Sequence, residues 1–258
     1  MSRSMMLFQR IKRLFFPPRC PSCATLSDWY APNCDASALF CPDCLNKWQE
    51  ARDEICEVCR KKVSACGCVT EEMKKAKCES FRKLVYYRHA RADAVQNRLI
   101  FFLKRTRNRD ANRAMAGLLL PALSELQSSS GTEASEQCLT FIPRSRTARA
   151  EYGTDQAEEL ALALAELSGL PMRRLIVRNR GKNKQQKSLS PQERQKNAKE
   201  SFRLSKNAEI CGKTVFLVDD IVTTGASMAA CARMLKRAGA KHIYALAIAS
   251  DDANRDRY

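Results

Sequence analysis

The sequence lacks several features that would each point to a particular class of protein. No apolar run approaches the ~18 residues that a membrane span requires. Residues 1–16 are too polar for a secretion signal, and their apolar positions at helical spacing instead predict a helix that docks on the protein rather than on a membrane. The motif G-x-x-x-x-G-K-[ST] does not occur, which excludes a nucleoside-triphosphate P-loop. We therefore expect a cytoplasmic protein without a transmembrane segment.

Acidic residues and histidines are also scarce. The chain has 45 Lys and Arg residues against 28 Asp and Glu, a formal net charge of +17 that favours polyanionic partners. Thiolates bound to zinc would lower this value. Only two histidines occur, His89 and His242, so a metal site in residues 1–80 would consist of cysteine alone. The length suffices for a good-sized domain and a smaller one, which we place at residues 81–258 and 1–80.

Cysteine, by contrast, is abundant, and its spacing predicts metal sites. Ten of the 13 cysteines lie in residues 1–80, and in a cytosolic chain such a cluster indicates metal rather than disulfides. Two C-x2-C pairs come first: Cys20 with Cys23, and 17 residues later Cys41 with Cys44. Each pair can place two thiolates on one ion, so the two pairs together predict a tetrahedral zinc site.

Five further cysteines compete for the four places of a second site. The compact choice uses Cys56, Cys59, Cys66 and Cys68, and the alternative has Cys78 in place of Cys66 or Cys68. We favour the compact set because tight turns order less chain. Both sites would be filled by thiolates, which leaves no position open for catalysis. Two structural zinc ions are therefore expected to stabilise a module that is too small to hold much of a core.

A different pattern joins a strand to a phosphate cradle. Residues 214–218 are apolar and β-branched, which predicts a buried strand, and Asp219 and Asp220 follow directly. A short turn then opens onto a predicted helix through Thr223, Thr224, Gly225, Ala226 and Ser227. Backbone N–H groups at a helix N-terminus bind phosphate, whereas the two acids suit sugar hydroxyls. The cradle and the acids together therefore predict a site for a sugar phosphate. A simple turn with capping hydroxyls would not explain the acids.

Strands and helices alternate along the rest of the chain. Strands are expected at 84–87, 139–142, 175–177 and 242–248, and helices at 94–103, 112–126 and after Asp155, with a flexible linker at 128–132. This order predicts an α/β fold with a mainly parallel, doubly wound sheet, preceded by the small cysteine-rich module.

Two basic tracts remain. Residues 104–109 form a dense basic turn that is either a solvated loop or a phosphate-binding edge. Residues 178–200 are too polar to be buried and too long for a simple crossover, so they are either a mobile flap over the ligand or a basic arm for single-stranded DNA. The charges of that arm would be Lys182, Lys184, Lys187, Arg194 and Lys196.

The loop from Asp219 to Ser227 resembles the phosphoribosyl-pyrophosphate loop of type I phosphoribosyltransferases, and the whole chain resembles the ComF family of competence proteins. The wider resemblance is carried by the cysteine pairs, by the acid-and-cradle loop, and by short motifs further along: Leu103-Lys104, Pro143-Arg144, Gln156, and Gln186, Leu189, Arg194 and Asn197. It implies a type I phosphoribosyltransferase-like domain behind an N-terminal double zinc ribbon.

The resemblance also implies roles for individual residues. Asp219 and Asp220 would contact the ribose hydroxyls, residues 223–227 would hold the 5′-phosphate, and magnesium would bridge ribose and pyrophosphate. Arg144 and Ser145 would lie in the pyrophosphate loop. The implied function is DNA uptake in natural transformation, with phosphoribosyl pyrophosphate, single-stranded DNA and other competence proteins as partners. The alternative is an active phosphoribosyltransferase that transfers ribose 5-phosphate to an unidentified nitrogen acceptor.

Overall fold

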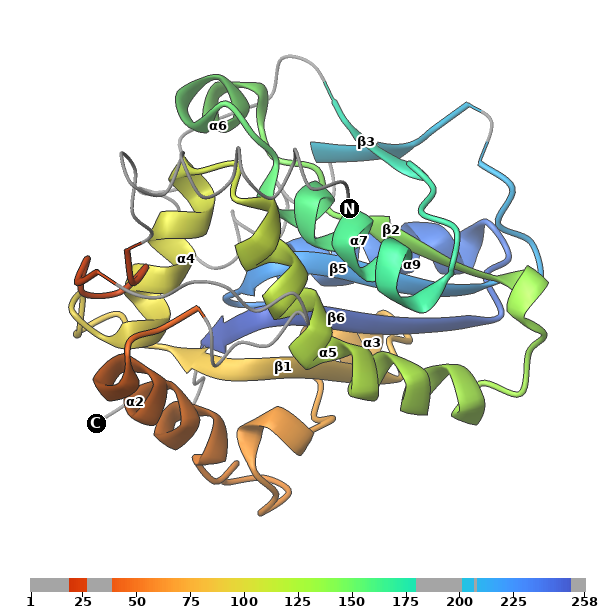
Figure 1. The fold of residues 1–258 in the computed structure, drawn as a ribbon. Helices are drawn as coiled ribbons and strands as arrows, with labels where there is room; N and C mark the ends of the chain where they lie inside the picture. Colours follow the sequence, from red (N-terminus) through yellow and green to blue (C-terminus); the bar gives the residue numbers. More distant parts are fainter. Residues whose placement is uncertain (1–18, 27–38, 180–200, 207, 252–258) are drawn as a thin grey trace, which may run out of the picture.

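The computed structural model describes residues 19–26, 39–179, 201–206 and 208–251 (Figure 1). The predicted N-terminal helix in residues 1–16 lies outside these ranges. So does nearly all of the predicted basic loop, including the five charges of the proposed arm. None of the helices in the described ranges combines the length and the apolar character that a membrane crossing requires.

Four parallel strands form the central sheet, in the order β1-β6-β5-β2. Their bounds are Ser80–Tyr87 for β1, Gln137–Phe141 for β2, Thr214–Val222 for β5 and His242–Asp251 for β6. All residues of β2 and most of those of β5 and β6 are buried, as expected when helices cover both faces of a parallel sheet.

Helices cover both faces of this sheet (Figure 1). On one face α4 (Val95–Arg105), α5 (Arg109–Ser129) and α7 (Gln156–Ser168) share a core with β5 and β6. On the other face α9 (Ala226–Arg237) and the short α3 (Glu71–Lys75) pack with the opposite side chains of the same strands. The predicted doubly wound α/β fold is therefore confirmed.

The predicted strand at 175–177 forms outside the central sheet. β3 (Ile176–Arg178) pairs antiparallel with β4 (Phe202–Leu204) in a separate two-stranded ribbon. Asn179 donates a backbone hydrogen bond to the carbonyl of Ser201 at 2.8 Å, so these two residues, one on each side of the basic tract, lie next to each other. The sequence of the apolar tripeptide 175–177 predicted a strand but did not indicate which sheet that strand would join.

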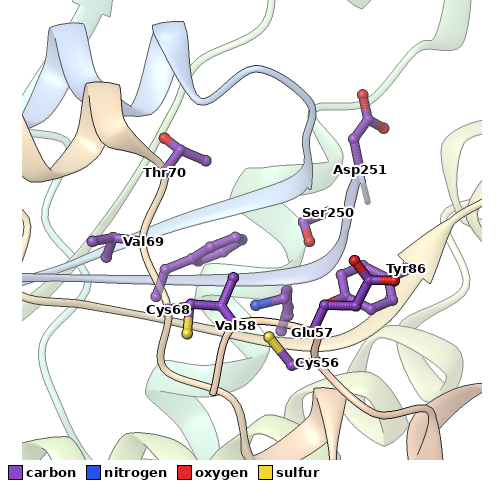
Figure 2. Close-up of a pocket in the computed structure, with 11 residues that line it drawn as sticks. Cys56, Glu57, Val58, Cys68, Val69, Thr70, Tyr86, Ser250 and Asp251 are labelled. Atoms are coloured by element: carbon purple, nitrogen blue, oxygen red, sulfur yellow. The ribbon is translucent and has the colours of Figure 1, made fainter. Parts of the chain in front are cut away.

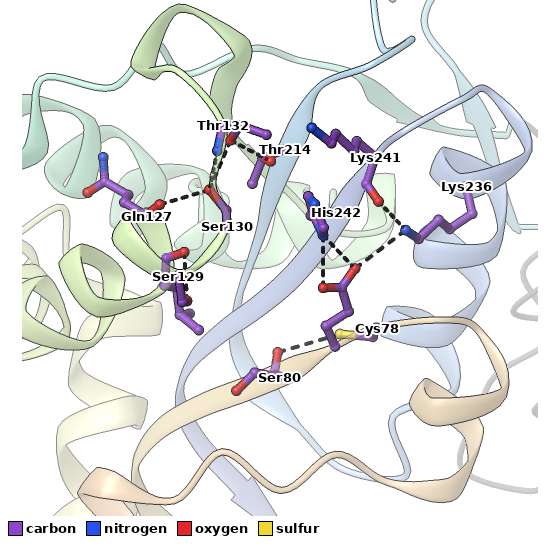
Figure 3. Close-up of polar contacts among 12 residues, drawn as sticks. Cys78, Ser80, Gln127, Ser129, Ser130, Thr132, Thr214, Lys236, Lys241 and His242 are labelled. Carbon is purple, nitrogen blue, oxygen red and sulfur yellow. Dashed lines mark hydrogen bonds and ion pairs between the residues drawn. The ribbon is translucent and has the colours of Figure 1, made fainter.

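The amino end of the sheet is closed by polar contacts (Figure 3). The predicted flexible linker at 128–132 is wrong, because α5 continues to Ser129 and the turn that follows is tied to β5. The Thr132 hydroxyl lies 2.9 Å from the hydroxyl of Thr214, at the start of that strand. Nearby, His242 Nδ1 lies 2.9 Å from a carboxylate oxygen of Glu79. This edge is therefore structural, and the carboxyl edge is left for ligands.

The cysteine-rich segment packs along the β1 side of the sheet (Figure 1). Its helix α2 (Pro42–Asp53) contacts α4 and β1, with Trp48 fully buried and its ring centre 5.4 Å from that of Phe40, the two rings tilted by 31°. The remaining short helices are α6 (Arg146–Tyr152) and the 3-10 turns Val63–Ala65 and Ala134–Glu136. The division into domains at residues 80 and 81 stays a prediction.

Candidate functional site

The acid pair lies inside the last part of β5, which extends beyond the predicted residue 218 to Val222. Ligands of open α/β sheets bind at this carboxyl edge. Three residues separate the strand from α9, whose N-terminal boundary is Gly225 with a φ of 75°. Only glycine adopts this left-handed conformation without strain, so Gly225 allows the sharp turn into the helix.

The predicted cradle residues surround the start of α9. Thr223 and Thr224 are exposed, Gly225 is buried, and Ala226 and Ser227 are half-buried. The Thr224 hydroxyl accepts a hydrogen bond from the backbone N–H of Ala226 at 3.4 Å. The first N–H groups of a helix have no partner within the helix, so this turn is suited to an anion.

Two cations converge on Asp220 from other elements. Nη2 of Arg144 lies 2.6 Å from its Oδ2, and Nζ of Lys104 lies 3.5 Å from the same atom. Arg144 follows β2, the neighbouring strand, while Lys104 belongs to the last turn of α4. For Lys104 this geometry favours the phosphate-binding edge over the solvated loop. Arg107 turns elsewhere, to the carbonyl of Gly153 at 2.9 Å.

The environment moves the pKa values of the two acids in opposite directions. Burial raises the pKa of Asp219 well above the usual range, and the adjacent Asp220 carboxylate raises it further. Burial also acts to raise the pKa of Asp220, but Lys104 and Arg144 outweigh it, so that pKa is lowered. Asp220 is thus the ionised partner of the cations, and Asp219 is the acid that gains most from a further cation.

Arg144 is held by residues that the sequence did not identify as part of the site. Its backbone N–H donates to Oδ2 of Asp155 at 2.9 Å, and its guanidinium lies 5.5 Å from the ring centre of Tyr152. Asp155 does precede α7, as predicted, but its side chain makes no cap there. Ser145 precedes α6, and its carbonyl accepts a hydrogen bond from the N–H of Arg149 at 2.8 Å.

A third basic residue, Arg178, lies near these cations. Arg178, at the end of β3, lies 5.0 Å from the ring centre of Phe202, and its Nη1 donates to the carbonyl of Pro143 at 3.3 Å. Burial lowers its pKa, while Cys231 and Asp219 act in the opposite direction. Among the described residues, Nη1 of Arg144 and Nε of Arg178 are buried without a hydrogen-bond partner. Both donors are free to bind a polar ligand at this edge of the sheet.

The cysteines gather into two groups of four. In each group the Sγ atoms lie within 4.8 Å of one another. The first consists of Cys20, Cys23, Cys41 and Cys44, and the second of Cys56, Cys59, Cys66 and Cys68. Cys78 belongs to neither: its thiol points to the carbonyl of Ser80 at 3.6 Å (Figure 3), and burial raises its pKa to about 12. Both groups could hold a metal ion.

The surroundings of the second group suit a metal with four thiolates. Burial and the thiols of Cys59 and Cys66 raise the pKa of Cys68 to about 12. The cysteines of this group can therefore be thiolates together only when a bound cation offsets their negative charge. Zinc bound by four thiolates keeps a net negative charge. The buried Lys83 places its Nζ 3.3 Å from Sγ of Cys66, where it can offset that charge. Four thiolates leave no open position, so the expected role is structural.

A cavity of about 110 Å³ lies beside this group, between Cys56 and Cys68 and the strands (Figure 2). Cys56 and Cys68 line one side, and Tyr86 and Ser250 line the other, at the carboxyl ends of β1 and β6. Thr70 lies at the margin nearest α3.

Comparison with known protein families gives one match within the chain. Residues 156–257 are similar to the family described as phosphoribosyl transferase domain. The matched range begins with α7 and includes the acid pair and the cradle.

The chain is also similar to the DNA utilization protein YhgH. It is 30% identical to that of Salmonella typhimurium over 142 residues, which are 55% of this chain and 61% of the relative. The protein of the same name from Salmonella typhi matches to the same extent. The match thus spans less than two thirds of these relatives.

Solved structures also match. The glutamine phosphoribosylpyrophosphate amidotransferase from B. subtilis complexed with ADP and GMP is 21% identical, covers 59% of this chain and 30% of its own, and gives a TM-score of 0.38. A crystal structure of adenine phosphoribosyltransferase is 20% identical over 58% of this chain and 76% of its own, also with a TM-score of 0.38.

Proposed function

We propose that this protein binds phosphoribosyl pyrophosphate with magnesium at the carboxyl end of β5 and acts, like a ComF protein, in handling DNA during uptake. One observation carries the proposal: two acids at a strand end adjoin a helix N-terminus, and cations from two other elements converge on one of the acids. Sugar hydroxyls, phosphate and pyrophosphate each have a matching group there.

Each part of the ligand would meet residues of this chain. Residues 223–227 would receive the 5′-phosphate, and Asp219 and Asp220 would accept hydrogen bonds from the ribose hydroxyls. Arg144 and Lys104 would bind the pyrophosphate. Carboxylate oxygens are the ligands that magnesium prefers, so the acid pair would hold it, and when bound it would neutralise charge on the pyrophosphate.

The role in DNA uptake rests on different support. The matched relatives are described as DNA utilization proteins. The formal charge of +17 favours a polyanionic partner, and single-stranded DNA bound mainly through its phosphates fits that charge. Other proteins of the uptake machinery are further proposed partners.

An active phosphoribosyltransferase is the second candidate. The buried, unpartnered N–H groups of Arg144 and Arg178 favour it, because they could stabilise charge on a departing pyrophosphate. In this reaction the ribose C1–O bond would break, a nitrogen of the acceptor would bond to C1, and its proton would pass to solvent. Pyrophosphate release that depends on an added acceptor or on DNA ends would support this candidate.

The double variant Asp219→Asn with Asp220→Asn tests the binding proposal. We expect calorimetry to show at least a hundredfold weaker binding of phosphoribosyl pyrophosphate with magnesium, while circular dichroism shows an unchanged fold. The matched control is Glu133→Gln with Glu136→Gln, two exposed acids near the amino end of β2, which should bind as the parent does. If the first variant binds as tightly as the control, the ligand does not use the acid pair.

A further inference from the structure

The cysteine-rich segment reaches the back of the cradle. A Cβ atom at Gly225 would lie 2.6 Å from Oγ1 of Thr70 and 3.3 Å from Cγ and Sδ of Met73. Both residues come from the start of α3, which packs against α9. Gly225 is therefore constrained from the cysteine side as well as by its φ. The backbone of Gly225 therefore lies close to α3, and a side chain at this position would not fit without a shift of Thr70 or Met73.

Thr70 and Met73 are connected to the second cysteine cluster by very little chain. Thr70 follows Cys68 by two residues, and its hydroxyl accepts the N–H of Met73 at 3.3 Å, which caps α3. The N–H of Cys68 points to Sγ of Cys66 at 3.4 Å. The carbonyl of Gly67 accepts from the N–H of Phe81 at 3.2 Å. The segment that leads into α3 is therefore held between the cluster, through Cys66 and Cys68, and β1, through Gly67.

Packing holds this segment only in part on its inner side: Val69 is partly buried against the core that contains α9, but a cavity lies beside it. Val69 and Thr70 line the cavity between the cluster and the strands (Figure 2), so atoms of the sheet do not fill the space beneath them. Met73, by contrast, is fully buried against the core that contains α9. If the cluster lost its order, residues 66–70 could shift toward the cavity and draw Met73 away from Gly225.

We propose that the second cysteine cluster, when it holds its metal, sets the position of residues 223–227 through Thr70 and Met73. Loss of the metal then weakens sugar-phosphate binding, although no cysteine touches the ligand. This inference rests on the proposed function of the cradle. Thr70 and Met73 are positioning residues in it.

The contact is tested with two variants that make the same chemical change. Met73→Ala and Met115→Ala each remove a fully buried methionine side chain, but Met115 lies in the core on the opposite face of the sheet. We expect Met73→Ala to weaken binding of phosphoribosyl pyrophosphate with magnesium about tenfold or more, and Met115→Ala to change it less than about twofold. Equal effects of the two variants would overturn the proposal, because general loss of stability would then explain both.

The metal is tested with Cys68→Ser, whose zinc content is measured alongside binding. We expect the variant to lose one zinc ion, to bind the ligand at least tenfold more weakly, and to exchange the amide hydrogens at the start of α9 faster than the parent. Unchanged exchange there after metal loss would overturn the coupling. Exchange is measured without ligand. If the parent failed to bind phosphoribosyl pyrophosphate, the proposed function would fall while the coupling could still be decided.

Discussion

Replacing Arg144 with methionine tests how the acid pair is held. The ion pair with Asp220 is short, at 2.6 Å, and only 13% and 10% of the two side chains are exposed. Removing one partner from a buried pair costs about 3–5 kcal/mol, because the other charge stays behind. Lys104 remains 3.5 Å from the same oxygen, so we expect the lower end, about 3 kcal/mol. That corresponds to a decrease in Tm of roughly 6–12 °C.

The effect should depend on pH in a defined direction. The folded state lowers the pKa of Asp220, so this carboxylate contributes stability above its ordinary pKa, and the contribution is lost as the pH falls through the lowered value. Methionine at position 144 removes part of that contribution. The difference between parent and variant should therefore be largest near neutral pH and shrink below about pH 4.

The measurement is denaturant unfolding of both proteins at several pH values. Arg109→Met is the matched control, because Arg109 is 79% exposed and its pair with Glu166 is a surface contact that contributes little. If Arg144→Met were no more destabilising than the control, the pair would not be buried as described. A difference that stayed constant with pH would refute the role of the Asp220 charge.

Three further predictions follow from the same contacts and from the charge pattern. Asp219→Asn should stabilise the protein at pH 7 by about 1 kcal/mol. Because the pKa of Asp219 is raised in the folded state, its carboxyl group costs stability as the pH rises through that pKa. Denaturant unfolding should therefore show the stabilisation at pH 7 but not at acidic pH. Metal analysis should find about two zinc ions per chain, and Cys44→Ser should lose one; fewer than about one in the parent would contradict both sites. Changing five basic residues to Gln should flatten the salt dependence of single-stranded DNA binding by about 3.5 in log–log slope, whereas weaker sugar-phosphate binding with an unchanged slope would indicate a flap. These are Lys182, Lys184, Lys187, Arg194 and Lys196.

The parts of the site that are local in sequence could be predicted. The acids, the small turn and the helix after it are contiguous, so hydrophobic pattern and turn chemistry were enough to place Asp219 and Gly225 at a ligand-binding strand end. The cysteine groups were predictable for the same reason, because the spacing of a C-x2-C pair determines which thiols can meet.

The residues that approach from elsewhere could not be predicted. Lys104 of α4 pairs with Asp220, and Arg178 of β3 interacts electrostatically with Asp219. The basic tracts in the sequence gave no sign of which of their members would lie near the acids. Asp155 matched a helix start, yet its carboxylate holds the backbone of Arg144. The error at 128–132 has the same cause, since the contact of Thr132 with Thr214 joins segments far apart in the chain.

The arrangement around Asp220 also predicts that the proposed ligand binds more tightly in the presence of magnesium. Without ligand, the Asp220 carboxylate is paired with Arg144 and Lys104. A ligand that brings both a divalent cation and a pyrophosphate can exchange partners with this group, so that the cation meets the carboxylates and the arginine meets the pyrophosphate. Pyrophosphate alone would take Arg144 from Asp220 and leave a buried carboxylate poorly paired, which is costly. We therefore expect phosphoribosyl pyrophosphate to bind at least tenfold more tightly with magnesium than with a chelator, while ribose 5-phosphate, which lacks the pyrophosphate, shows a smaller difference in calorimetry. Equal dependence on magnesium for the two ligands would contradict this exchange.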